Sequence, residues 1–273
     1  MSDPTINQLQ QNRGVIIETK ITDFIAGVLP YQVVNPLGDW SGFEPRGENQ
    51  FSNHQDSMAC VTFSALNCIE TQYKFLTGKE INFSDRFIAK LSGTTQQGNT
   101  IQKVLDTIRK YGLVLETEWP TPASFSWDEY YATIPPEVLA KARKFTIGYE
   151  FGSPDYAHDL KQAPLQMIIV KDNPYHAVEM INLTRQFDSY PPYDEMQQSI
   201  HTVCKIILKG VPMTEFVRNL SVPGEFGLLI SSPVCKTYVP ASTEIDLKAR
   251  GGDNIPLKAD GTVDYTKARD ITL

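Results

Sequence analysis

The sequence is poor in cysteine, and the few cysteines it has lack the spacing of a metal site. Four cysteines occur in 273 residues, and no two of them form a Cys-x-x-Cys pair. This number is too small for a disulfide framework, and the spacing is not that of a structural zinc site. We therefore expect a reducing compartment and no metal or organic cofactor.

The chain also lacks long apolar runs and stretches of positive charge. No run approaches the roughly 20 apolar residues of a membrane-spanning helix. The first residues have neither the basic nor the apolar region of a secretory signal. The net charge is −7, and basic residues do not cluster, which argues against a nucleic-acid partner. The sequence predicts a protein that contacts neither membrane nor nucleic acid.

Among the features that are present, residues 55–64 are the most informative. A polar loop passes directly into a run whose apolar residues have helical spacing. Cys60 is thus predicted in the first turn of a helix, with Asp56 or Ser57 as N-cap and Gly78 just past its end. The positive end of the helix dipole lowers the pKa of a thiol, which suits a nucleophile. A small buried cysteine is the alternative interpretation.

A second region supplies the groups that a cysteine nucleophile needs. Such a nucleophile requires a base and a third group that orients the base. His176 begins an apolar, strand-like run, and Asp188 follows twelve residues later. If residues 176–183 and 186–190 form a hairpin, the two side chains become cross-strand neighbours within hydrogen-bonding reach.

These motifs, in this order, resemble those of papain-like cysteine peptidases. Gln55 followed by Cys60-Val61-Thr62-Phe63-Ser64 is similar to the family's glutamine and Cys-aromatic-Ala-Phe-Ser motif. Tyr175-His176-Ala177-Val178 resembles its Asn-His-Ala-Val, and Phe187-Asp188-Ser189-Tyr190 resembles its Asn-Ser-Trp segment. Two weaker matches are Asn49-Gln50, similar to an Asn-Gln near the family's mature N-terminus, and Gln97-Gly98-Asn99, similar to its substrate-lining Asn-Gly-Gly.

The resemblance implies an α+β fold of two lobes. The papain-like domain would span residues 36–240, with a helical lobe at about 50–125 and an antiparallel β-barrel-like lobe at about 140–235. Residues 1–35 would form an N-terminal arm packed on the domain, with a short propeptide or an assembly contact as alternatives. Residues 241–273 would be a C-terminal extension that contacts a partner or the domain itself.

The resemblance also implies roles for individual residues. Cys60 would be the nucleophile, His176 its base and Asp188 the group that orients His176. Gln55 would share the oxyanion hole with the Cys60 backbone N–H, and Gly98 and Asn99 would contact an extended peptide or protein substrate. The chain departs from the family in three places. Gln55 is one residue closer to Cys60 than usual, which leaves Asn53 and His54 as alternatives; Val61 replaces an aromatic residue; and Asp188 replaces the usual asparagine.

A similar arrangement occurs in papain-like proteins of bacteriophages and bacteria. This similarity favours the cytoplasm or a phage particle as the location. It also raises the alternative of a structural protein of a phage particle or other assembly whose activity is reduced or lost. Hydrolysis of a cell-wall amide is a further alternative to protein cleavage, since it would use the same three groups.

Overall fold

The computed structural model describes residues 14–16, 29, 31–52, 55–153, 155–170, 175–196, 199–209, 227–231 and 236–240. The chain divides into two compact units: residues 1–75 with 79–209, and residues 76–78 with 210–273. No helix in the described ranges is long and apolar enough to span a membrane.

The first unit combines helices with one large sheet, which confirms the predicted α+β class. Its helices are α2 (Cys60–Thr77), α3 (Asp85–Leu91), α4 (Ile101–Tyr111), the 3-10 helix η1 (Glu116–Glu118), α5 (Trp127–Tyr130), α6 (Pro136–Leu139) and α7 (Tyr156–Asp159). Its strands are β1 (Phe51–Ser52), β2 (Gln55–Asp56), β3 (Thr146–Phe151), β4 (Leu165–Val170), β5 (Tyr175–Met180), β6 (Arg185–Phe187), β7 (Asp194–Met196) and β8 (Ile200–Lys209).

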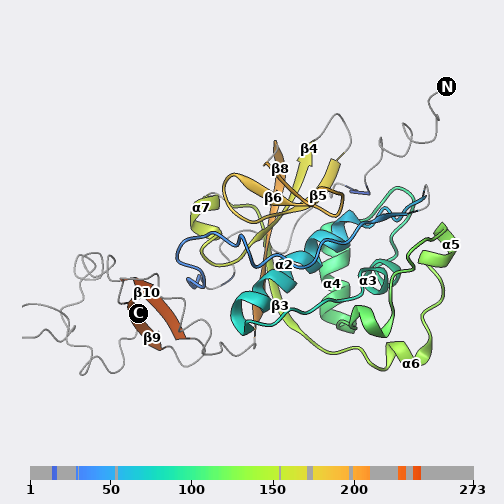
Figure 1. Ribbon diagram of the computed structural model, residues 1–273, viewed down its shortest axis with the longest axis horizontal. Coiled ribbons are helices and arrows are strands. Elements are labelled where there is room, and N and C mark those ends of the chain that lie inside the picture. Colours follow the sequence, from blue (N-terminus) through green and yellow to red (C-terminus); the bar gives the residue numbers. More distant parts are fainter. Residues whose placement is uncertain are drawn as a thin grey trace, which may run out of the picture. The chain divides into compact units, whose positions relative to one another are not determined.

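Helix α2 lies between the sheet and helices α3 and α4 (Figure 1). Two glutamines tie it to the strands. The Gln72 side chain donates to the Ile206 carbonyl and accepts from the Leu208 N–H of β8, and Gln166 of β4 donates to the Val61 carbonyl. Burial extends beyond the predicted apolar stripe to polar residues of α2, because helices cover one face and the sheet the other. The helix ends where predicted, before Gly78, whose φ of 66° suits a helix stop.

The sequence predicts two further helices, one that starts at Ser84 and one that is capped by Asn99 and ended by Gly112. Both are present, with one correction. Helix α3 begins after Ser84, as expected. For α4 the N-cap is Thr100, whose side chain accepts from the Lys103 N–H, and not Asn99 as predicted. The side-chain oxygen of Asn99 instead accepts a hydrogen bond from the Thr100 N–H. The helix ends at Gly112, with a φ of 86°, as predicted.

The sheet is antiparallel, with strand order β3-β8-β4-β5-β6-β7. It is open, with β3 and β7 at its edges, so the barrel-like closure predicted for this lobe is not formed by the described strands. Strand β3 lies in a segment for which no strand was predicted, although Ile147, Tyr149 and Phe151 alternate with less apolar residues. Its pairing with β8 across the chain, from Thr146 with Lys209 to Phe151 with Cys204, is a long-range contact.

A buried charged cluster joins β3, β8 and α7. The Lys205 ammonium of β8 lies 2.6 Å from Glu150 Oε1 and 2.8 Å from Asp159 Oδ1, and all three side chains are buried. The other Glu150 oxygen accepts the backbone N–H of Leu29, at 2.9 Å. One described residue of the N-terminal arm is thereby attached to the sheet edge.

The second unit contains a hairpin of β9 (Gly227–Ser231) and β10 (Lys236–Pro240). By its sequence, the apolar run at residues 226–231 favours a last strand of the barrel-like lobe. The strand is present from Gly227 onward, but its partner is β10, and the two form a sheet of their own.

Candidate active site

Cys60 is the first residue of α2 and has no solvent-exposed surface. The chain enters the helix through Met58, whose φ of 57° is unusual for a residue with a side chain. Asp56 does not act as a helix cap, because its Oδ1 accepts the N–H of Met58, at 2.7 Å and ahead of the helix. The turn therefore places the thiol at the buried junction of helix and sheet.

The electrostatic environment of the thiol differs from the sequence expectation. Burial raises the pKa of Cys60, and the carboxylates of Asp56 and Asp188 raise it further, while a hydrogen bond from the Ala177 backbone N–H lowers it. The lowered pKa expected from the helix N-terminus is thus wrong for this closed arrangement, because desolvation disfavours the thiolate more strongly. The contact with Ala177 also shows that the thiol lies beside the strand that carries His176.

His176 lies in β5 and is fully buried. Its Nε2 is 2.6 Å from Asp188 Oδ1, so the predicted hydrogen bond between these side chains is present. The hairpin differs slightly from the prediction, since β5 and β6 pair only from Glu179–Phe187 to Met180–Gln186. His176 Nδ1 is buried and has no hydrogen-bond partner among the described residues. One ring nitrogen is therefore oriented by a carboxylate, and the other is available.

Gln55 is not brought to these groups by any described contact. Its side-chain amide donates to the carbonyl oxygen of the adjacent Asp56, at 2.7 Å, and the side chain is half-buried. The alternatives Asn53 and His54 lie outside the described residues.

A different glutamine, Gln50, lies against the loop that carries Asp188. Gln50 is fully buried; its N–H donates to the Ser189 carbonyl at 3.1 Å, and its Oε1 accepts the Ser189 hydroxyl at 2.8 Å. Its Nε2 donates to the Tyr190 hydroxyl, at 2.5 Å. The sequence carried a signal for it in the Asn49-Gln50 match, but spacing alone favoured Gln55. Nine residues, among them the β1–β2 hairpin, intervene between Gln50 and Cys60.

Gly98 and Asn99 are covered by the N-terminal arm. Val15 forms a parallel bridge with Asn99, in which the Ile16 N–H donates to the Asn99 carbonyl at 2.8 Å. The Asn99 N–H in turn donates to the Gly14 carbonyl, at 2.9 Å. A Cβ on Gly98 would overlap the Gly14 backbone, so only glycine permits this approach.

Gly14 also reaches the loop before Cys60. Its φ is 88°, and a Cβ there would overlap the carbonyl oxygen of Met58. The backbone of the arm is therefore held between Gly98 on one side and Met58 on the other. The arm of residues 1–35 as a whole stays a prediction, since the structure describes only residues 14–16, 29 and 31–35 of it.

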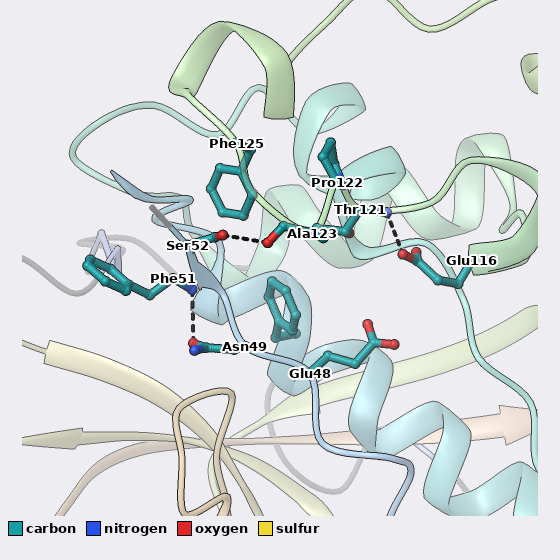
Figure 2. Close-up of a pocket in the computed structure, with 10 residues that line it drawn as sticks. Glu48, Asn49, Phe51, Ser52, Glu116, Thr121, Pro122, Ala123 and Phe125 are labelled. Carbon is teal, nitrogen blue, oxygen red and sulfur yellow. Dashed lines mark hydrogen bonds between the residues drawn. The ribbon is translucent and has the colours of Figure 1, made fainter. Parts of the chain in front are cut away.

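A cavity of about 430 Å³ lies beside the β1–β2 hairpin (Figure 2). Ser52 of the hairpin donates its hydroxyl to the Ala123 carbonyl at 2.8 Å, which fixes the hairpin to the helical lobe. Glu48 and Glu116 extend into the cavity, and burial raises the pKa of Glu116 to about 7. Cys60, His176 and Asp188 are not among its lining residues, so this cavity is separate from the closed site.

Comparison with known proteins gives likeness at the level of structure. No protein-family model and no curated protein sequence matches the chain. The digestive procathepsin L2 proteinase of Tenebrio molitor larval midgut is similar, with a TM-score of 0.53 and 14% identity over 76% of this chain and 80% of that chain. Procathepsin L 3 of the same source has a TM-score of 0.51 and 15% identity over 75% of this chain and 79% of that chain. Xylellain, a cysteine protease from Xylella fastidiosa, has a TM-score of 0.50 and 14% identity over 72% of this chain and 96% of that chain.

At identities this low, the structural likeness shows the fold alone, and the chemistry has to be argued from the residues. These structural neighbours are cysteine proteases, and this chain has a helical region packed against an antiparallel sheet. The chain thus has a papain-like fold, with Cys60 at the start of the central helix and His176 on the facing strand.

Proposed function

We propose that the protein is a papain-like cysteine peptidase that hydrolyses peptide or amide bonds through Cys60, His176 and Asp188. The observation that carries this proposal is the buried imidazole of His176. Its Nε2 is bonded to a carboxylate, and its Nδ1 has no partner in the part of the chain that the structure describes. The Cys60 thiol lies against the amide of the next residue, Ala177. A base in this state, oriented from one side and available on the other, is what a thiol nucleophile requires.

The reaction would proceed by acyl transfer. His176 takes the proton of the Cys60 thiol, and the sulfur attacks the carbonyl carbon of the substrate. As the C–N bond breaks, the departing amine receives that proton from His176, leaving a thioester on Cys60. Water, deprotonated by His176, then attacks the thioester, releases the acid and restores the thiol. Asp188 holds the imidazole in position throughout.

Stabilisation of the oxyanion needs donors in addition to the Cys60 backbone N–H. Gln55 is the donor that the sequence predicts, and Gln50 is the glutamine whose amide lies at the Asp188 loop. Both N–H groups of the Gln50 amide already donate, to Asp56 Oδ1 and to the Tyr190 hydroxyl, so we assign the role to Gln55, whose amide has one described acceptor. Loss of one such donor typically lowers kcat by about 10²- to 10³-fold. Gln55→Ala should show this loss.

The arm in this structure lies where we propose that substrate binds. Gly98 and Asn99 would pair with an extended peptide through backbone groups, and those of Asn99 are already used by Gly14 and Ile16. The full burial of Cys60 is consistent with such a closed state. Substrate would therefore have to displace residues 14–16.

The same closure favours one other candidate function: a catalytically reduced papain-fold protein of an assembly, such as a phage particle. A thiol with a raised pKa and no exposed surface is unreactive as it stands. The two functions differ in whether the closed state opens.

The test is reaction of the full chain with a peptide-like electrophile under reducing conditions, followed by mass spectrometry of each cysteine. A peptidase should be modified at Cys60 ahead of the buried Cys68 and Cys204, and His176→Gln should abolish the preference. Cleavage of a mixed peptide library, lost in Cys60→Ala, would complete the demonstration. Equal, slow modification of Cys60, Cys68 and Cys204 together with no cleavage would favour the assembly protein.

A further inference from the structure

Asp56 is a buried carboxyl group that the proposed reaction does not use. It ends strand β2, four residues before Cys60, and only 2% of its surface is exposed. Its Oδ1 accepts the Met58 N–H at 2.7 Å and the Gln50 amide at 3.0 Å. Its Oδ2 accepts the hydroxyl of Tyr190. Three donors thus converge on a single side chain, an arrangement that favours the ionised form of a carboxyl group.

The donors come from both sides of the site. Met58 belongs to the turn that leads into α2, whereas Tyr190 follows Asp188 in the loop after β6. The Tyr190 N–H donates to Asp188 Oδ1 at 3.1 Å, and its ring lies 5.2 Å from that of His176, centroid to centroid. Asp56 therefore links the residues that position the thiol to those that position the imidazole.

The network also accounts for the orientation of Gln50. Its Nε2 carries two hydrogens, and its two described acceptors are Asp56 Oδ1 and the Tyr190 hydroxyl. Its Oε1 is held by Ser189. The amide plane is defined by these three contacts, so removal of the Asp56 carboxylate would free one N–H and release the plane.

The charge of Asp56 acts on both reactive groups. The neighbouring ionisable groups are Cys60 on α2, Tyr131 after α5, His176 on β5, and Asp188 and Tyr190 in the loop after β6. Burial raises the pKa of Asp56 overall, although the hydrogen bonds from Tyr190, Met58 and Gln50 and the charge of His176 act to lower it. An ionised Asp56 favours a protonated imidazole at His176, which is the form that donates a proton to the leaving amine.

We propose that Asp56 is a positioning residue of the site, whose carboxylate holds Gln50 and Tyr190 across the seam between helix and sheet and supplies negative charge to His176. The inference rests on the proposed function for its catalytic meaning, but the charge coupling is a property of the folded chain. It can therefore be measured without turnover.

The experiment is an NMR titration of the histidine rings in the full chain, with the His176 signal assigned by its loss in His176→Gln. A neighbouring opposite charge typically shifts a pKa by about 1–3 units. Asp56→Asn should therefore lower the His176 titration midpoint by about 1 pH unit, whereas Asp128→Asn, an exposed carboxylate outside the network, should leave it unchanged. In Asp56→Ala, added formate should enter the space of the missing carboxylate and restore most of the midpoint.

A midpoint unmoved in Asp56→Asn, with the fold intact by circular dichroism, would overturn the coupling. A shift without recovery by formate would overturn the carboxylate-specific role and leave only a packing effect. Peptide cleavage by the wild-type chain reports on the proposed function alone, so a chain that shows the shift but cleaves nothing would contradict the peptidase and retain the role of Asp56.

Discussion

Replacement of Gly14 by alanine should open the site. Gly14 has a φ of 88°, and a Cβ there would overlap the Met58 carbonyl oxygen. A side chain in the left-handed region costs about 1–2 kcal/mol before any clash. The arm is held against Asn99 by two backbone hydrogen bonds, each worth about 0.5–1.5 kcal/mol. The strain is thus comparable to the holding energy, and because 1.4 kcal/mol is tenfold in an equilibrium constant, the open population should rise about 5- to 30-fold.

The assay is the rate of Cys60 alkylation by iodoacetamide at neutral pH, read by mass spectrometry. If opening limits access, the rate rises by the same 5- to 30-fold factor, and the hydrated thiol also ionises more readily once burial no longer raises its pKa. Cys68 and Cys204 in the same molecule report global unfolding, and their rates should stay constant.

The matched control is Gly42→Ala, because Gly42 has a φ of 86° but no atom within 4 Å of an added Cβ. It carries the same backbone strain without touching the arm or Met58. The reasoning is refuted if Gly14→Ala and wild type are alkylated at the same rate. It is also refuted if Gly42→Ala accelerates Cys60 equally, since strain anywhere in the unit would then suffice.

Three further predictions concern the rest of the first unit. Asp188→Ala should lower the rate of peptide cleavage by about 10- to 150-fold, the range for loss of a hydrogen bond to a charged group, whereas Asp188→Asn, which keeps an acceptor for His176 Nε2, should retain most of it. Lys205→Met leaves two buried carboxylates without their cation and should reduce the free energy of unfolding by about 3–5 kcal/mol, measured by urea denaturation, while Lys209→Met at the exposed end of the same strand should change little. Glu116 has a folded-state pKa raised from 4.5 to about 7, so the folded chain binds its proton more tightly and loses stability as pH rises from about 4.5 to 7. Because Glu116→Gln does not undergo this loss, its free energy of unfolding should increase relative to that of wild type between pH 5 and pH 8. The same difference between variant and wild type at both pH values would contradict this.

Local patterns in the sequence were sufficient for the elements that carry the candidate site. The apolar spacing after Cys60 predicted the helix, and Gly78 and Gly112 marked helix ends because a glycine readily adopts positive φ. The His176–Asp188 hydrogen bond followed from a short hairpin, in which residues close in sequence become neighbours in space. These inferences depend on interactions within about a dozen residues, which a sequence displays directly.

The tertiary structure decided what surrounds those elements. Burial of Cys60 reversed the expected direction of its pKa shift, because desolvation depends on the helix, the sheet and the arm together. Three sets of contacts join residues that are distant in the chain: the approach of Gly14 to Gly98, the pairing of β3 with β8, and the convergence of three donors on Asp56. The sequence alone leaves several possible partners for each of these groups. No local pattern specifies such contacts, since they exist only once the packing of the whole unit has fixed which backbone and side-chain groups meet.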